Sequence, residues 1–138
     1  MDTLRRRSFL GTVSALVFVW GACTTVQVPT TKIKIGERMP DFTLRDPGGN
    51  PHSLSEFKGK KAVVVIFIAT RCPYSNAFNG VMGKLAREYT DRSVVFVGIN
   101  SNRTEPVAEV AAHAQANGFG FLVLKDEESV VAMIDGGN

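Results

Sequence analysis

The chain of 138 residues carries 16 basic and 13 acidic side chains, for a formal net charge of +3, and 44% of its residues are hydrophobic. This length suits one domain of ordinary size. Two cysteines are too few for a disulfide-dense scaffold, and two cysteines and two histidines without close spacing do not indicate a structural zinc site.

The N-terminus has the pattern of an export signal. Three arginines at residues 5–7 precede 14 uncharged residues, 9–22, a run too short to span a membrane comfortably. The Arg-Arg-Ser-Phe-Leu sequence at residues 6–10 resembles the twin-arginine signal, and the ordinary route for unfolded chains stays open as the alternative. We therefore expect residues 1–22 to direct export.

A cysteine closes the apolar run. Ala22 and Cys23 resemble the cleavage box of a bacterial lipoprotein, in which the cysteine becomes the lipidated N-terminus, although Trp20 departs from the aliphatic residue usual there. An uncleaved anchor or a chance cysteine is the alternative. Polar, threonine-rich residues 23–31 predict a tether to a domain at 32–138. The expected location is periplasmic or cell-envelope, anchored to the membrane by lipid.

The basic excess of the chain belongs to this signal. Without residues 1–22, 13 basic and 12 acidic residues remain, a net charge of +1. They are scattered, with no basic stripe and no interleaved aromatic platform, so the sequence does not predict nucleic-acid binding.

The first elements after the tether are short. Residues 32–35 and 41–44 alternate polar and apolar side chains, as expected for short strands with one wet face. Between the second strand and the helical turn predicted at 54–59, the Asp-Pro-Gly-Gly-Asn-Pro run at 46–51 is a dense turn signal. Together they indicate a hairpin-like entry to the domain.

An apolar strand and a long helix follow. Residues 62–69 are uninterrupted apolar residues, β-branched at five of eight positions, which predicts a strand buried on both faces, as in a parallel sheet. Apolar side chains then recur at helical spacing over residues 78–89.

The rest of the chain repeats this alternation. Residues 94–99 predict a second strand, and residues 104–106 predict the start of a helix that continues to Gly118. Residues 121–124 predict a third strand, and Asp126 is placed to cap a last helix that runs to Ile134. Strands that alternate with helices predict an α/β fold with right-handed crossovers.

Cys72 is the residue best placed for chemistry. It follows the 62–69 strand and precedes the first long helix, and the carboxyl end of a parallel strand is where α/β folds usually place their sites. A helix N-terminus favours an anion, and Arg71 adds positive charge if its side chain turns inward, so the thiolate is favoured. We predict a nucleophile at Cys72; a small, buried and inert cysteine is the alternative.

Four segments carry a resemblance to a known family. They are residues 36–44, Leu54 with 57–60, residues 63–73, which end in Ile-Ala-Thr-Arg-Cys-Pro, and residues 95–100. In this order they resemble the redoxin branch of the thioredoxin-like superfamily, which holds alkyl hydroperoxide reductase/thiol-specific antioxidant proteins and membrane-tethered thiol-disulfide oxidoreductases. The resemblance implies a thioredoxin-like α/β fold with an N-terminal hairpin followed by βαβαβ.

Two departures from the family concern the chemistry. Ser75 stands where a dithiol oxidoreductase has its second cysteine, so with Cys23 lipidated the resemblance implies that an external thiol resolves a sulfenic acid or mixed disulfide on Cys72. Ser75 either hydrogen-bonds the thiolate or, on the simpler interpretation, caps the helix. Ala69 and Val65 replace the threonine and proline of peroxiredoxins, which makes peroxide the least expected substrate.

A third departure concerns the second half of the fold. The family carries a cis-proline loop, an antiparallel hairpin and a final helix, whereas all six prolines here lie at or before Pro106. We expect a fold without the C-terminal hairpin and helix. The 62–69 strand then lies at the edge of the sheet, open to pairing with another chain.

The sequence thus predicts an exported, membrane-tethered thiol oxidoreductase of antioxidant or peroxidase-like type, with one nucleophilic cysteine. Its expected partners are an external reductant, either thioredoxin-like or a small thiol, and a disulfide, sulfenic acid or peroxide substrate, without cofactor or metal. Two alternatives stay open: a non-catalytic redoxin-like envelope lipoprotein with an inert Cys72, and a non-functional truncated paralogue.

The remaining polar positions predict less. Residues 100–104 border the site or serve as a polar connector. His52 and His113 lack a carboxylate or second histidine at metal spacing, and we predict both as surface residues.

Overall fold

The computed structural model describes residues 33–135. The export signal predicted at 1–22, Cys23 with its predicted lipidation and the tether at 23–31 lie outside the described residues. Their predictions therefore stay predictions.

Strands and helices alternate along the described chain, as predicted. The strands are β1 (Thr43–Arg45), β2 (Pro51–Ser53), β3 (Ala62–Phe67), β4 (Val94–Asn100) and β5 (Leu122–Lys125). The helices are the 3-10 helix η1 (Leu54–Phe57) and the α-helices α1 (Pro73–Ala77), α2 (Asn79–Thr90), α3 (Val107–Ala116) and α4 (Val130–Asp135).

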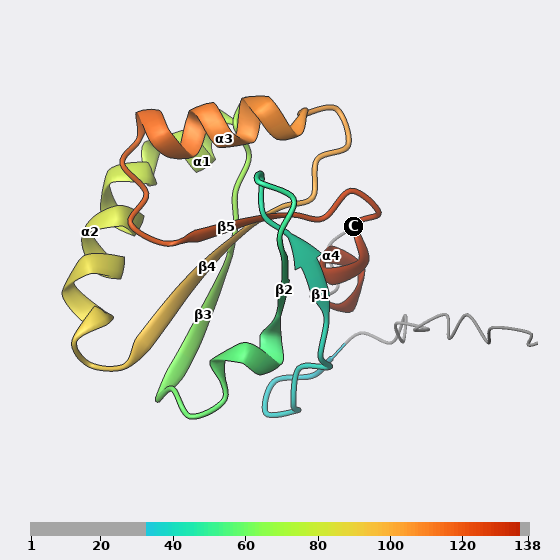
Figure 1. The fold of residues 1–138 in the computed structure, drawn as a ribbon, viewed down its shortest axis with the longest axis vertical. Coiled ribbons are helices and arrows are strands. Elements are labelled where there is room, and N and C mark those ends of the chain that lie inside the picture. The colour runs from blue at the N-terminus through green and yellow to red at the C-terminus, as the bar shows by residue number, and fades with distance from the viewer. Residues whose placement is uncertain (1–32, 136–138) are drawn as a thin grey trace, which may run out of the picture.

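All five strands form one sheet in the order β2-β1-β5-β4-β3 (Figure 1). β3, β4 and β5 are parallel, and β1 runs antiparallel to β2 and β5. The β3–β4 register runs from Ala62 opposite Val94 to Phe67 opposite Ile99. Among residues 33–135 no hairpin follows β5, and β3 is an edge strand, as predicted.

The N-terminal hairpin confirms one predicted turn and corrects one predicted strand. The Asp46 N–H donates to the Asn50 carbonyl at 2.9 Å, and this bond closes the β1–β2 turn. The prediction of a strand at 32–35 is wrong for residues 33–35, the part of it that the structure describes. The Glu37 N–H instead donates to the Lys34 carbonyl at 3.0 Å, and Gly36 has a φ of 91°, so residues 34–37 form a turn.

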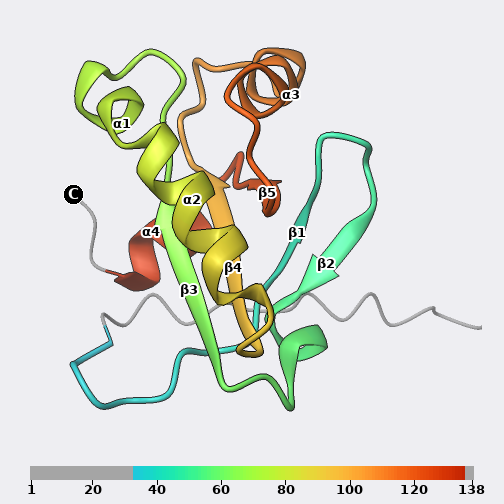
Figure 2. The same ribbon diagram turned by 90° about the vertical axis from the view of Figure 1, so that its left-hand side faces the viewer.

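Apolar clusters lie on both faces of the sheet, and Figure 2 shows α2 and α4 on opposite sides of it. On one face Val97, Ile99 and Leu124 pack with Val131 of α4, and on the other Val123 packs with residues of α2 and α3. No helix among residues 33–135 is long and apolar enough to cross a membrane.

Burial is greatest in β4 and not, as predicted, in the strand before Cys72. The last five residues of β4 are buried, whereas no residue of β3 is buried, and Phe67 is 40% exposed. The apolar run predicted the strand correctly. Because β3 has a sheet neighbour on one side only, its other edge is open and its side chains stay partly exposed.

The helix predicted at 78–89 is α2 (Asn79–Thr90), and Phe78 separates it from the short helix α1 that precedes it. α2 buries Met82 and Ala86 against the sheet, while Phe78, Val81 and Leu85 stay exposed. The helical periodicity therefore predicted the helix correctly but not which of its apolar side chains face the core.

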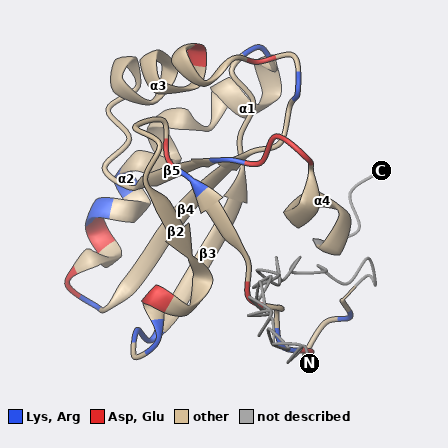
Figure 3. Cartoon of the chain, turned by 45° about the vertical axis from the view of Figure 1, so that its right-hand side comes forward, with Lys and Arg blue, Asp and Glu red and all other residues tan. Residues whose placement is uncertain are grey.

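Asp126 caps α4, as predicted. Its carboxylate accepts the N–H groups of Val130 at 2.8 Å and Val131 at 3.0 Å, and the residue is 1% exposed. α2 carries both basic and acidic residues, whereas the β5–α4 connection is acidic (Figure 3).

Candidate functional site

Cys72 lies beyond the carboxyl end of β3, as the N-cap residue of α1. Its thiol is free and partly exposed, and its side chain makes no capping hydrogen bond. Pro73 supplies the first helical residue, where a missing N–H costs least, and the Asn76 N–H donates to the Cys72 carbonyl at 3.0 Å. The thiol is thus carried on an extended residue between a strand end and a short helix.

Side chains of α1 hold the backbone just before Cys72. The Ala69 N–H donates to Ser75 Oγ at 3.1 Å, and Asn76 Nδ2 donates to the Thr70 carbonyl at 3.0 Å. The predicted site residue Ser75 therefore lies in the site, but in neither predicted role: among the described residues its oxygen accepts from the Ala69 N–H just past β3, it has no hydrogen bond to the thiol, and Cys72 is the N-cap of α1.

Glu105, between β4 and α3, holds the same loop from the other side. Its carboxylate accepts the N–H of Thr70 at 2.9 Å and the N–H of Arg71 at 3.2 Å. The residue is 3% exposed, and Asn102 Nδ2 donates to it at 3.1 Å. One buried carboxylate thus binds both peptide groups that precede the cysteine.

Asn100 and Lys125 complete this network. Asn100 Nδ2 donates to Glu105 Oε2 at 2.6 Å and to the Ile68 carbonyl at 3.1 Å, while Lys125 Nζ donates to Asn100 Oδ1 at 2.7 Å. Asn100 is 0% and Lys125 7% exposed. The carboxyl ends of three neighbouring strands are therefore joined by buried polar side chains, as buried polar groups require.

The electrostatics of the network favour a charged Glu105. Burial alone would raise the pKa of Glu105, but the hydrogen bonds from Thr70, Asn100, Arg71 and Asn102 outweigh it and lower the pKa to about 2. Burial lowers the pKa of Lys125, against the nearby carboxylates, of which Glu105 is the strongest influence. The opposite charges of Glu105 and Lys125 compensate one another inside the protein.

Arg71, the third predicted site residue, turns its side chain to α3. Its Nε donates to Glu109 Oε1 at 2.9 Å, and a second guanidinium nitrogen lies 2.5 Å from the other carboxylate oxygen. Thr70 Oγ1 donates to the same carboxylate. The Arg71 side chain is 59% exposed, so this ion pair lies at the rim of the site.

Arg71 and Cys72 thus lie at the end of the loop after β3, beside Ser75 in the first turn of α1. Glu105, Glu109 and Lys125 were not predicted as site residues. Glu105 was interpreted only as part of a helix start, and Lys125 was not singled out. A usable signal was present for Lys125 alone, because it ends an apolar strand at the same end of the sheet as Cys72, whereas Glu105 lies five residues past the end of β4. Residues 100–104 were expected either to border the site or to serve as a polar connector. Asn100 and Asn102 donate to Glu105, so this segment borders the site.

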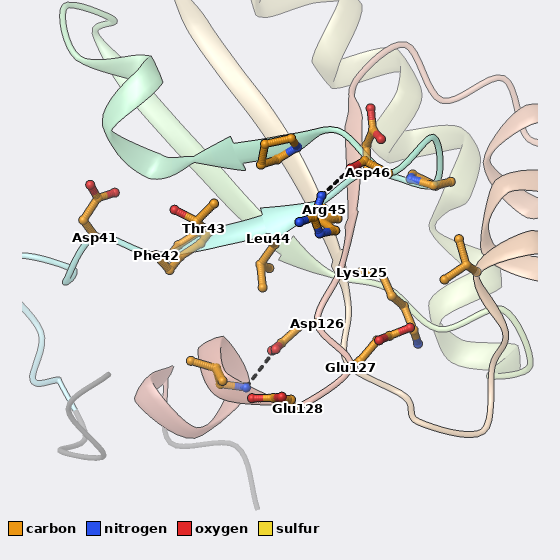
Figure 4. A pocket seen from close by; sticks show the side chains of 15 residues that line it. Asp41, Phe42, Thr43, Leu44, Arg45, Asp46, Lys125, Asp126, Glu127 and Glu128 are labelled. Atoms are coloured by element: carbon orange, nitrogen blue, oxygen red, sulfur yellow. Dashed lines mark hydrogen bonds between the residues drawn. The ribbon is translucent and has the colours of Figure 1, made fainter. Parts of the chain in front are cut away.

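A cavity of about 720 Å³ lies between the β1–β2 hairpin and the β5–α4 connection and borders this network at Lys125, which lines it (Figure 4). The Asp126 carboxylate in its wall points to the first turn of α4, where it is used as a cap. Glu127 and Glu128 line the same wall. Among residues 33–135, no group of three or more histidines, cysteines or acidic residues is arranged to hold a metal ion.

Comparisons with known proteins agree on one family. Residues 34–136 match the family model Redoxin. Thioredoxin-like protein YneN of Bacillus subtilis is 32% identical over 114 residues, which are 82% of this chain and 66% of YneN. This chain therefore spans slightly less than two thirds of that relative.

Solved structures show the same likeness. A hypothetical protein of Sinorhizobium meliloti, SMc02350, is 38% identical with a TM-score of 0.69, over 74% of this chain and 58% of that chain. A secreted Mycobacterium tuberculosis disulfide oxidoreductase homologous to E. coli DsbE is 27% identical with a TM-score of 0.59, over 67% of this chain and 66% of that chain.

Proposed function

This chain belongs to the redoxin family and has its thioredoxin-like α/β fold, and from that premise we propose that it is a thiol oxidoreductase with Cys72 as the nucleophile. The observation that carries the proposal is the placement of a free, partly exposed thiol on a loop whose backbone is held by Ser75 and Glu105. An inert structural cysteine needs no such support.

The proposed reaction is thiol–disulfide exchange. The Cys72 thiolate attacks one sulfur of a substrate disulfide, an S–S bond forms to Cys72, and the second substrate sulfur leaves as a thiolate. An external thiolate then attacks the mixed disulfide at the substrate sulfur, forms a new disulfide with it and releases the Cys72 thiolate. The external thiol is required because position 75 is serine and Cys72 is the free cysteine of the described residues.

Two other substrates use the same thiol. A substrate sulfenic acid condenses with the Cys72 thiol to a mixed disulfide and water. A hydroperoxide transfers one oxygen atom to the thiolate and, with one proton, leaves as an alcohol or water; two external thiols then return the Cys72 sulfenic acid to the thiol, with a disulfide and water as products.

We assign supporting roles to the other two predicted site residues. Ser75 keeps the end of β3 against α1 through its bond from the Ala69 N–H. Arg71 ties the loop before Cys72 to α3 through its ion pair with Glu109, which offsets the charge of the guanidinium.

Export and membrane tethering are part of the same proposal. They are supported by the arginines at 5–7, the uncharged run at 9–22 and the Ala22-Cys23 pair. The relative of known structure from M. tuberculosis is a secreted protein. Mass spectrometry of the membrane-extracted protein tests this: we expect a chain that begins at a lipidated Cys23, and an intact N-terminus with unmodified Cys23 would contradict it.

The enzymatic proposal is tested by trapping. The full chain is incubated with glutathione disulfide, and the mixed disulfide is located by peptide mass spectrometry. We expect glutathione on Cys72, its release by added thiol, and no adduct on this peptide in Cys72→Ser, while Cys23→Ser keeps the Cys72 adduct. Without an adduct on Cys72 in the folded chain, the non-catalytic alternatives are correct.

A further inference from the structure

Glu105 contacts the peptide groups that lead into Cys72, and not the side chains of that loop. Its two carboxylate oxygens lie 2.9 Å from the Thr70 nitrogen and 3.2 Å from the Arg71 nitrogen. We propose that Glu105 is the positioning residue of this site, which sets the orientation of the Cys72 thiol toward the sulfur it attacks. This inference rests on the proposed function.

The bonds around Glu105 leave the loop little freedom. The Ala69 N–H is held by Ser75 and the Thr70 carbonyl by Asn76, so together with Glu105 they fix the peptide planes on both sides of Thr70. The direction of the cysteine side chain then depends on the backbone torsions at Arg71 and Cys72, where α1 begins. In thiol–disulfide exchange the attacking sulfur must approach along the S–S axis, and a displacement of about 1 Å can cost on the order of a hundredfold in rate.

Glu105 is itself held in place. Asn100 donates to its carboxylate at 2.6 Å and to the Ile68 carbonyl at the end of β3, while Asn100 Oδ1 accepts from Lys125. The ammonium group of Lys125 also donates to the Asn102 carbonyl at 2.5 Å. Through these bonds the ends of β4 and β5 fix the carboxylate, which is how a precise site is supported by residues behind it.

A neighbouring carboxylate provides a matched comparison. Glu109 binds the hydroxyl of Thr70 and the guanidinium of Arg71, the side chains of the two residues whose N–H groups bind Glu105. Glu105→Gln leaves one acceptor oxygen and adds an amide N–H that faces other donors, so at least one of the two backbone bonds is lost. Glu109→Gln leaves both backbone bonds in place.

The experiment compares two reactions of Cys72 in the full chain. Exchange with glutathione disulfide demands the in-line approach, whereas alkylation by iodoacetamide, a small reagent, is less demanding. We expect Glu105→Gln to slow exchange at least tenfold while the rate of alkylation changes less than threefold. Glu109→Gln should slow exchange less than Glu105→Gln does. Amide hydrogen exchange at Thr70 and Arg71 should accelerate in Glu105→Gln, and Glu88→Gln on the exposed surface of α2 is the unaffected control.

Glu105→Asp is the second variant, for the case that Glu105→Gln does not fold. It keeps the negative charge near Lys125 but withdraws the carboxylate oxygens by about 1.5 Å, one C–C bond. It should show the same selective loss. Exchange within twofold of wild type in a folded Glu105 variant, an equal loss in Glu109→Gln, or alkylation and exchange that change in parallel would each overturn the inference. Absence of exchange in the wild type, by contrast, would refute the proposed function itself.

Discussion

Two regions of this protein are organised by carboxylates, and they differ in burial. At the carboxyl ends of β3, β4 and β5, Glu105 and Asp126 are 3% and 1% exposed and together bind five backbone N–H groups. In the N-terminal hairpin, Asp46 and Glu56 flank His52 at the surface, with contacts of 3.4 Å and 3.2 Å.

This difference in burial decides which of the polar contacts hold the backbone in place. A buried carboxylate must keep its partners, because losing one exposes it to the full cost of desolvation, whereas an exposed ion pair exchanges its partner for water. The loop before Cys72 is held by a buried carboxylate, that of Glu105. We therefore expect the chemistry of this protein to depend on the buried region and to tolerate changes in the hairpin.

The largest effect is expected from Lys125→Met. It leaves buried Asn100 Oδ1 and the Asn102 carbonyl without their donor and removes the nearby positive charge that favours buried, charged Glu105, which should lower the free energy of unfolding by about 3 kcal/mol. Urea denaturation measures this, with Lys84→Met on exposed α2 as the control. A loss below about 1 kcal/mol would show that the buried network is no stronger than a surface contact.

The second expectation concerns acid. The pKa of Glu105 is about 2 in the native state and ordinarily 4.5, so its contribution to stability is complete above about pH 4.5 and is lost as the pH falls toward 2. Over this window the free energy of unfolding should fall less steeply in Glu105→Gln than in the wild type. Identical slopes would contradict a charged, hydrogen-bonded Glu105.

A smaller effect is expected from Asp126→Ala. The substitution removes the cap of α4 and the acceptor of the Ser101 hydroxyl, and it should cost about 1–2 kcal/mol in thermal or urea unfolding. Asp46→Ala, at a partly exposed carboxylate, is the matched variant and should lower the free energy of unfolding less. Equal losses would remove the contrast between the two regions.

The smallest effect is expected at His52. Burial lowers its pKa, but the hydrogen bonds and charges of Glu56 and Asp46 outweigh this and raise it above 6.5. The contribution to stability is therefore complete below pH 6.5 and is lost as the pH rises through the higher native pKa. Melting curves from pH 5 to 9 should show this slope in the wild type and not in His52→Asn, with disulfide exchange at Cys72 unaffected.

The sequence predicted local structure well where local chemistry decides it. The Asp-Pro-Gly-Gly-Asn-Pro turn, the apolar strands and the Asp126 cap follow from neighbouring residues alone. The strand predicted at 32–35 failed because two alternating pairs of residues are too weak a signal against a turn that contains Gly36. The edge position of β3 followed from the family resemblance, whereas its partial exposure contradicts the burial inferred from its apolar run.

The sequence predicted the thiol of the site, Cys72, but not the charged residues that hold the loop before it, Glu105 and Lys125. Cys72 could be placed because a thiol after an apolar strand is a local pattern. Glu105 binds residues 34 and 35 positions away, and Lys125 reaches Asn100 across 25 positions. Such pairs depend on how β4 and β5 lie beside β3, which no local pattern encodes.

The measurement that tests the central claim most directly is the rate of mixed-disulfide formation at Cys72 in the folded chain, divided by the rate in the urea-unfolded chain at the same pH. If the fold holds Cys72 as a nucleophile, the ratio should exceed about ten, because orientation of the attacking group accelerates the reaction. A ratio at or below one would contradict the account and show that Cys72 is a structural residue.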